Sequence, residues 1–213
     1  FEPSLFYGSR DQDAALAETA YYRFVFWSGM TTAPPSGKLT TEHTAFGACF
    51  AVGKGLRLQA EPFAAFRERL IDPGDYADTQ LLGRNMREAG IEAFEYLSAR
   101  DPAQGINVAL FHAGAFSGHQ PLWQEAWLCQ TRAQGVSFYN KSVGTRRYAL
   151  DQFLVAGNLP APAVAHGDDG VAIEHAPHSA CCSARSGTIG SVIIAAGEDG
   201  GTKQKNAQGT MHA

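Results

Sequence analysis

Large apolar side chains are missing from the last part of this 213-residue chain. Residues 161–213 contain no leucine, phenylalanine, tyrosine or tryptophan, whereas they contain eight glycines. A segment that cannot bury large side chains gains too little free energy to offset the entropy of ordering. We therefore expect the folded part to end near Leu159-Pro160, followed by a flexible or non-native tail over residues 161–213.

Cysteines, long apolar runs and an excess of basic residues are lacking as well. The four cysteines are too few and too unevenly spaced for a disulfide scaffold, which indicates a reducing, cytoplasmic compartment. The longest apolar run near the end, Ser191–Ala196, falls far short of the roughly 18 to 20 residues that a membrane span needs. With 17 basic and 21 acidic residues, the net charge of −4 provides no broad basic surface. We therefore expect neither nucleic acid nor a membrane as a partner.

Common phosphate-binding and hydrolase signatures are also absent. The sequence has no GxxxxGK[ST] loop, no GxGxxG after a strand, no GxSxG elbow and no HExxH helix. Metal-capable side chains gather in the tail, where a metal site is the less favoured alternative, because adjacent cysteines do not readily chelate one ion. We predict no metal site and no resident cofactor. The metal-capable side chains of the tail are His166, Asp168, Asp169, His175, His178, Cys181 and Cys182.

What is present predicts an α+β domain with antiparallel strands and few helices. A capping-box spacing at Ser9 and Gln12 starts a helix that Gly29 ends, and Asp75 caps a second helix that ends at Gly90. A shorter helix is expected over residues 62–70. The first helix has one apolar stripe, formed by Leu16, Ala17, Ala20, Tyr21, Phe24 and Trp27.

Strands are expected from β-like runs bounded by turn residues. Residues 46–58 predict two strands joined by a hairpin turn at Gly53-Lys54-Gly55. Residues 91–97 and 106–111 predict two further strands around the turn 101–105.

One carboxylate, Glu18, stands next to the apolar edge of the first helix. On pattern alone, a solvated flank is the more common reading of such a residue, and a turn-capping serine with a surface arginine is the more common reading of Ser98 and Arg100. These residues become candidates together with Tyr7, which ends the preceding β-like run.

Two blocks of the sequence resemble one known family. Residues 6–18, FYGSRDQDAALAE, are similar to the "LY…ALAE" block of the RES domain, a family named for an arginine, a glutamate and a serine. Residues 75–80 (DYADTQ), 90–100 (GIEAFEYLSAR) and 107–111 (NVALF) are similar to its second block, in the same order and separation. The resemblance spans roughly residues 3–118.

The resemblance implies a fold akin to ADP-ribosyltransferases and cleavage of the nicotinamide–ribose bond of NAD⁺, with phosphate or water as the acceptor. With phosphate, the reaction is a glycosyl transfer. The family includes toxins of bacterial toxin–antitoxin pairs, so the resemblance also implies a cognate antitoxin protein as a partner. By residue, the resemblance implies Tyr7, Glu18 and Ser98 as catalytic residues, and Tyr7, Ser98 and Arg100 as NAD⁺-binding residues. The family's signature arginine is expected upstream of Tyr7, in a segment that this chain lacks, and Leu97 replaces the usual proline.

These residue types suit that chemistry. Breaking an N-glycosidic bond passes through an oxocarbenium-like state, which a carboxylate such as Glu18 stabilises. Tyr7 can stack on nicotinamide, and Ser98 and Arg100, two apart on one strand face, can hold a phosphate.

The implied organisation is a catalytic domain over residues 1–118, with its N-terminal part missing, and an extension over 119–160 packed on it. Two alternatives to an NAD⁺-degrading toxin remain open. One is a catalytically inactive RES-like binding module. The other is an enzyme that transfers ADP-ribose to a macromolecule.

Overall fold

The computed structural model describes residues 5–161 and 189–196 of the chain. Within them, three α-helices accompany nine strands of one sheet. The helices are α1 (Gln12–Ser28), α2 (Arg67–Leu70) and α3 (Ala77–Glu88). The strands are β1 (Phe6–Ser9), β2 (Leu39–Phe50), β3 (Gly55–Arg57), β4 (Ala93–Leu97), β5 (Ile106–Leu110), β6 (Trp123–Arg132), β7 (Gly135–Asn140), β8 (Gly144–Ala149) and β9 (Ile189–Ala196). Short 3₁₀ turns cover Phe63–Phe66, Ala113–Ala115 and Leu150–Phe153.

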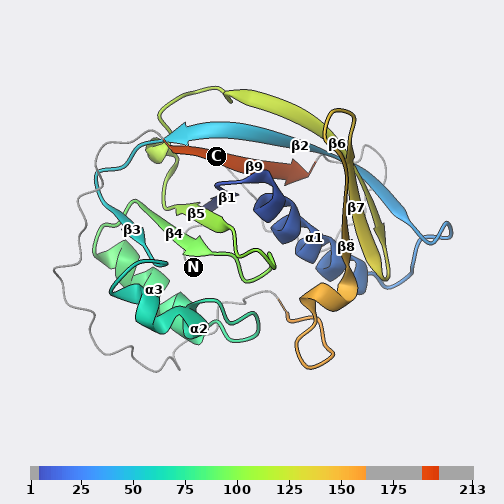
Figure 1. Cartoon of the computed structure of the whole chain (residues 1–213), viewed down its shortest axis with the longest axis horizontal. Helices are drawn as coiled ribbons and strands as arrows, with labels where there is room; N and C mark the ends of the chain where they lie inside the picture. The colour runs from blue at the N-terminus through green and yellow to red at the C-terminus, as the bar shows by residue number, and fades with distance from the viewer. Residues whose placement is uncertain (1–4, 162–188, 197–213) are drawn as a thin grey trace.

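The strands lie in the order β3-β4-β5-β1-β9-β2-β6-β7-β8. Among these described strands, every neighbouring pair is antiparallel except β3 and β4, which run parallel. The predicted α+β class with a mainly antiparallel sheet and few helices is therefore confirmed. Strands β6, β7 and β8, from the part of the chain expected to be an extension, belong to the same sheet as β1 and β5 (Figure 1).

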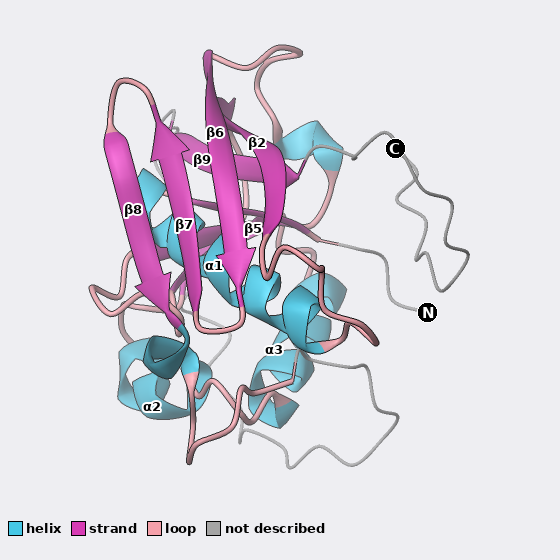
Figure 2. Ribbon diagram, turned by 90° about the vertical axis from the view of Figure 1, so that its right-hand side faces the viewer, coloured by secondary structure: helices cyan, strands magenta, loops and turns pink. Residues whose placement is uncertain are grey.

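Helix α1 packs across one face of the sheet. Its apolar stripe is buried as predicted from Leu16 to Phe24, whereas Trp27 is only partly buried. The stripe contacts side chains of β2, β6 and β7 in the largest core cluster, and Figure 2 shows these strands side by side with α1 behind them. This packing fixes the helix rigidly on the sheet. The cluster comprises Leu16, Ala20, Tyr21, Phe24, Ala45, Trp127, Cys129, Val136, Phe138 and Phe153.

Helix α3 belongs to a separate core cluster at the β3–β4 end of the sheet. Its Met86 packs against Leu58 and Phe111, and Leu82 adds to the same cluster. Gly90 follows the helix with a positive φ of 71°, as expected for a residue just beyond a helix end. Asp75 accepts a hydrogen bond from the amide of Ala77, but the N-cap of α3 is Tyr76, one residue after the predicted cap.

Two local predictions are wrong. The cap of α1 is Asp11, whose side chain accepts from the Ala14 amide at 2.8 Å, and Ser9 instead belongs to β1. The segment 53–55 does not form a hairpin, since β3 pairs with β4 rather than with β2. The carboxylate of Glu92 accepts hydrogen bonds from the amides of Gly53 and Lys54, and thereby directs β3 toward β4.

One strand lies within the segment whose composition predicts no folded structure. Residues 189–196 form β9, which pairs with β1 and β2. The rest of that segment lies outside the described residues. No helix of the described part is both long and apolar enough to cross a membrane.

Candidate active site

Glu18 lies on α1 at the margin of the buried stripe, where its side chain meets the ends of β4 and β5. Two donors converge on one of its oxygens. Ser98 Oγ donates to Oε1 at 2.6 Å, and Asn107 Nδ2 donates to the same atom at 2.7 Å. The other oxygen, Oε2, accepts no hydrogen bond from any described residue. Glu18 is therefore anchored through one oxygen and presents a second one for a further interaction.

Ser98 is fully buried and immediately follows β4, which ends at Leu97. While donating to Glu18, its hydroxyl accepts from the amides of Arg100 and Asp101 at 3.1 and 3.0 Å. A hydroxyl has one hydrogen and two lone pairs, so these three bonds use its whole capacity. The expectation that Ser98 and Arg100 share a strand face is wrong, because both lie in the turn beyond the strand.

Asn107 is the residue that orients the second donor. It is buried on β5, opposite Ser9 of β1, and Ser9 Oγ donates to its Oδ1 at 2.6 Å. Because Oδ1 accepts this bond, the amide nitrogen points to Glu18. The strand pair β1–β5 thus sets the position of the carboxylate on α1.

The environment of Glu18 raises the pKa of its carboxyl group, mainly through desolvation by burial. The hydrogen bonds from Ser98 and Asn107 and the charge of Arg100 act in the opposite direction, because they favour the ionised form. Glu18 is therefore a poorly hydrated carboxylate whose ionisation depends on its neighbours, as is common in active sites.

Arg100 is nearly buried and is held from two sides. Its guanidinium lies 3.8 Å from the centroid of the Tyr21 ring, and its Nη2 donates to the Tyr76 hydroxyl at 2.6 Å and to the Pro73 carbonyl at 3.0 Å. Both of these bonds use Nη2, and the guanidinium retains further N–H donors.

The two tyrosines around Arg100 are themselves anchored to the backbone near residue 160. The Tyr21 hydroxyl donates to the carbonyl of Pro160 at 2.8 Å. The Tyr76 hydroxyl lies 3.1 Å from the carbonyl of Ala161, in addition to its bond with Pro73. Arg100, Tyr21, Tyr76 and the segment 160–161 thus form one connected unit.

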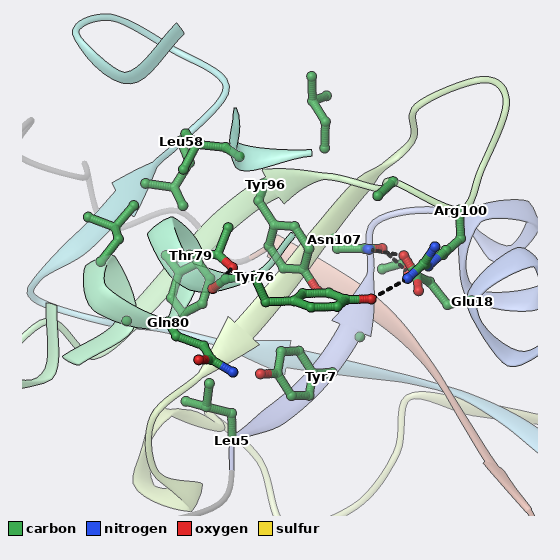
Figure 3. A pocket seen from close by; sticks show the side chains of 18 of the residues that line it. Leu5, Tyr7, Glu18, Leu58, Tyr76, Thr79, Gln80, Tyr96, Arg100 and Asn107 are labelled. Carbon is green, nitrogen blue, oxygen red and sulfur yellow. Dashed lines mark hydrogen bonds between the residues drawn. The ribbon is translucent and has the colours of Figure 1, made fainter. Parts of the chain in front are cut away.

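Glu18, Arg100 and Tyr7 line one cavity of about 660 Å³. Figure 3 shows Thr79 and Gln80 of α3 on one side, Glu18 and Arg100 on the other, and tyrosine rings between them. The tyrosines that line the cavity are Tyr7, Tyr21, Tyr22, Tyr76 and Tyr96. A mostly apolar cavity with a few converging polar groups is the usual form of a small-molecule site.

Tyr7 stands on β1 with 54% of its surface exposed. Desolvation in the cavity raises the pKa of its phenol to about 12, with the Tyr22 phenol contributing and Arg87 opposing. The hydroxyl of Tyr7 therefore stays protonated at neutral pH and can donate a hydrogen bond. Its exposed ring offers a stacking surface.

The structure brings together the residues that the sequence singled out. Glu18, Ser98 and Arg100 are connected through hydrogen bonds and a shared backbone turn, and Tyr7 lines the same cavity. Ser98 lines a smaller neighbouring recess rather than the main cavity, and it is hydrogen-bonded to two residues of the main cavity, Glu18 and Arg100. The sequence reasoning did not select Asn107, although a polar residue inside the apolar strand 106–110 is a signal for a buried polar contact.

The described residues contain no group of three or more histidine, cysteine, aspartate or glutamate side chains arranged to hold an ion. The metal-capable side chains from His166 to Cys182 lie outside the described residues. Among the described residues, the hydrogen-bond donors to Glu18 are the uncharged side chains of Ser98 and Asn107.

No curated protein matches the chain. The family model of the RES domain matches residues 2–131, a span that includes Tyr7, Glu18, Ser98, Arg100 and Asn107. The mainly antiparallel α+β architecture agrees with the ADP-ribosyltransferase-like fold of that family. Since the match covers more than half of the chain, the protein belongs to the RES domain family.

Proposed function

We propose that the protein is an NAD⁺-degrading enzyme that cleaves the nicotinamide–ribose bond, with phosphate or water as the acceptor. The observation that carries the proposal is the carboxylate of Glu18, which is anchored through Oε1 at the wall of a cavity lined by tyrosines. Family membership supports the same reading. As in other toxins of this kind, a cognate antitoxin protein would neutralise the activity.

Glu18 would act on the ribose. As the bond between the ribose carbon and the nicotinamide nitrogen breaks, its electron pair passes to the nitrogen and positive charge develops on the ribose. A carboxylate that is already fixed in a poorly hydrated site stabilises this charge without reorganising. The open Oε2 atom suits a hydrogen bond from a ribose hydroxyl, because the described residues make no use of it.

Tyr7 would hold the nicotinamide. Its half-exposed ring provides a face for an aromatic ligand, and a positively charged pyridinium is attracted to the π-system of a tyrosine. The nicotinamide nitrogen loses its charge on cleavage, so this attraction weakens as the leaving group forms and favours its release.

Arg100 would bind the acceptor phosphate beside Glu18. Its Nη2 atom is engaged by Tyr76 and Pro73, and its remaining donors suit a phosphate oxygen. Ser98 would act as a positioning residue for Glu18, since its hydroxyl is fully used within the protein.

The test is release of nicotinamide from NAD⁺ by the purified full chain, with and without phosphate, compared with Glu18→Gln. The glutamine keeps an oxygen for the Ser98 and Asn107 bonds but removes the charge. We expect its rate to fall by about 10²–10³, the usual effect of removing one electrostatic contact to a transition state. Arg132→Ala, on the surface at the end of β6, serves as the control.

The products distinguish the remaining alternatives. ADP-ribose 1″-phosphate identifies phosphate as the acceptor and free ADP-ribose identifies water, whereas labelled protein after incubation with labelled NAD⁺ identifies macromolecular transfer. An inactive binding module predicts intact NAD⁺ under all conditions. The cavity joins Tyr7 to Glu18, whereas Ser98 lines the neighbouring recess and hydrogen-bonds to Glu18, so release of nicotinamide and not the cavity separates the two proposals.

A further inference from the structure

Helix α3 contributes two arginines to the cavity wall that have no role in the chemistry described above. Arg84 and Arg87 both line the cavity. They are three residues apart, so they lie on the same side of the helix. The Arg87 guanidinium lies 4.8 Å from the centroid of the Phe111 ring, which limits its orientation. Arg84 takes part in none of the ion pairs found among the described residues.

The helix is open beside these arginines because it contains a glycine there. A methyl group built on Gly83 would meet no atom within 4 Å, and Gly83 itself lines the cavity. A glycine inside a helix is destabilising relative to alanine. Close packing does not explain the glycine at position 83, because a methyl group there would meet no neighbouring atom. Its effect is to keep this part of the cavity wall free of a side chain.

The position of α3 relative to Glu18 gives the cavity two chemically different ends. In Figure 3, Gln80 of α3 lies on the far side of the tyrosines from Glu18 and Arg100. Gln80 and Arg84 are four residues apart on one helix face. Arg100 is held at the Glu18 end by Tyr21 and Tyr76, so the positive charge at the α3 end comes from Arg84 and Arg87.

We propose that Arg84 and Arg87 form a binding site for the diphosphate of a nucleotide ligand, with the open surface at Gly83 accommodating its nucleoside. The assignment of the two ends rests on the proposed function, since a ribose at Glu18 places the attached diphosphate farther along the cavity. Guanidinium groups bind phosphate oxygens through paired, charge-assisted hydrogen bonds. A guanidinium stacked on an aromatic ring is already oriented, which reduces the entropy lost on binding.

The direct test is calorimetric titration with adenosine diphosphate. We expect Arg84→Ala and Arg87→Ala each to weaken binding by roughly tenfold, and the affinity of the unmodified chain to fall with added salt. Nicotinamide riboside, which carries no phosphate, should bind all three proteins equally. Arg132→Ala is the control for loss of one positive charge outside the cavity. Unchanged binding of adenosine diphosphate to both cavity variants would overturn the proposal.

Gly83→Leu separates binding from folding. Leucine favours helix formation and fills the open space, so we expect an equal or higher Tm together with weaker binding of adenosine diphosphate. A variant that binds this nucleotide as tightly as the unmodified chain would refute the role of the open surface.

Turnover of NAD⁺ distinguishes failure of this inference from failure of the proposed function. If the unmodified chain releases nicotinamide, we expect Arg84→Ala and Arg87→Ala to raise KM more than they lower kcat. Cleavage with an unchanged KM in both variants overturns the diphosphate site and leaves the function standing. If the unmodified chain releases no nicotinamide but the two variants lose adenosine diphosphate binding, the proposed function is overturned and the diphosphate site stands.

Discussion

Ser98 donates a hydrogen bond of 2.6 Å to Glu18, joining a turn after β4 to a helix 80 residues earlier in the chain. The same serine oxygen accepts from the Arg100 and Asp101 amides, so the carboxylate and the turn that carries Arg100 are positioned by one atom. A change at this hydroxyl therefore affects both the proposed ribose-binding group and the proposed phosphate-binding group.

Replacing Ser98 with alanine should shift the pH dependence of the reaction. The bond from Ser98 lowers the pKa of Glu18 against the stronger effect of burial, so its loss raises that pKa further. If the ionised carboxylate is the active form, the acidic limb of the rate profile moves to higher pH. We expect about a tenfold lower rate at pH 7, since a hydrogen bond to a charged group is worth about 1.5 kcal/mol or more. Ser117→Ala, at an exposed serine, should leave the profile unchanged.

Glu18→Gln should stabilise the fold at neutral pH while it lowers the rate of NAD⁺ cleavage. Because burial raises the folded-state pKa above the unfolded value, ionisation favours unfolding. The resulting loss of stability begins as pH rises past the unfolded pKa of about 4.3 and is complete above the folded pKa. The Tm of the variant should exceed that of the unmodified chain at pH 7, and the difference should vanish below about pH 4. A lower Tm at pH 7 would contradict the assigned burial.

Asn107→Asp should make stability strongly dependent on pH. The substitution replaces the donor 2.7 Å from Glu18 Oε1 with a second carboxylate. Two adjacent carboxylates cannot both ionise without cost, so we expect a loss of about 2 to 4 kcal/mol at pH 8. Part of it should return as the pair takes up a shared proton on acidification. Chemical denaturation at several pH values measures the effect.

Asn107→Ala is the matched control for this prediction. It removes the same donor and leaves the Ser9 hydroxyl without its acceptor, but it adds no charge. Its loss of stability should vary much less between pH 5 and pH 8. Equal pH dependence in the two variants would show that the carboxylates do not interact.

Gly105→Ala should displace the start of α1. A methyl group there would lie 2.7 Å from the Ala14 side chain and 2.8 Å from the carboxylate of Asp11, the helix cap. Relief of these contacts requires movement of the helix that carries Glu18. We expect a loss of about 1 to 3 kcal/mol in unfolding free energy and a lower kcat. Gly118→Ala, which meets only an ordinary contact at 3.8 Å, should change neither.

The sequence was sufficient for elements that depend on local spacing. The buried stripe of α1 followed from residue order, and the strands β4 and β5 were placed to within a few residues. Elements that depend on distant partners were not predictable in this way. Ser9 has the chemistry of a helix cap, but pairing with Asn107 on β5 places it in a strand and leaves the cap to Asp11.

The candidate site shows the same limit. The family resemblance singled out Glu18, Ser98 and Arg100 as candidate site residues. Their arrangement in space depends on contacts between residues that are 80 or more positions apart in the sequence. Ser98 and Arg100 are two residues apart, so the sequence predicts them on one face of a strand. Hydrogen bonds from the following amides to the Ser98 hydroxyl instead fold this segment into a turn. The turn buries the serine behind Glu18 and brings the arginine over Tyr21.

The anchoring of Tyr21 and Tyr76 has an evolutionary consequence. Both phenols lie within hydrogen-bonding distance of main-chain carbonyls, that of Pro160 for Tyr21 and those of Pro73 and Ala161 for Tyr76, and every amino acid supplies such a carbonyl. Substitutions at positions 160 and 161 can therefore accumulate while the hold on Arg100 persists. The two tyrosines have no such freedom, because phenylalanine would keep the ring and lose the hydroxyl. Among relatives, we therefore expect positions 160 and 161 to vary more than the tyrosines at positions 21 and 76.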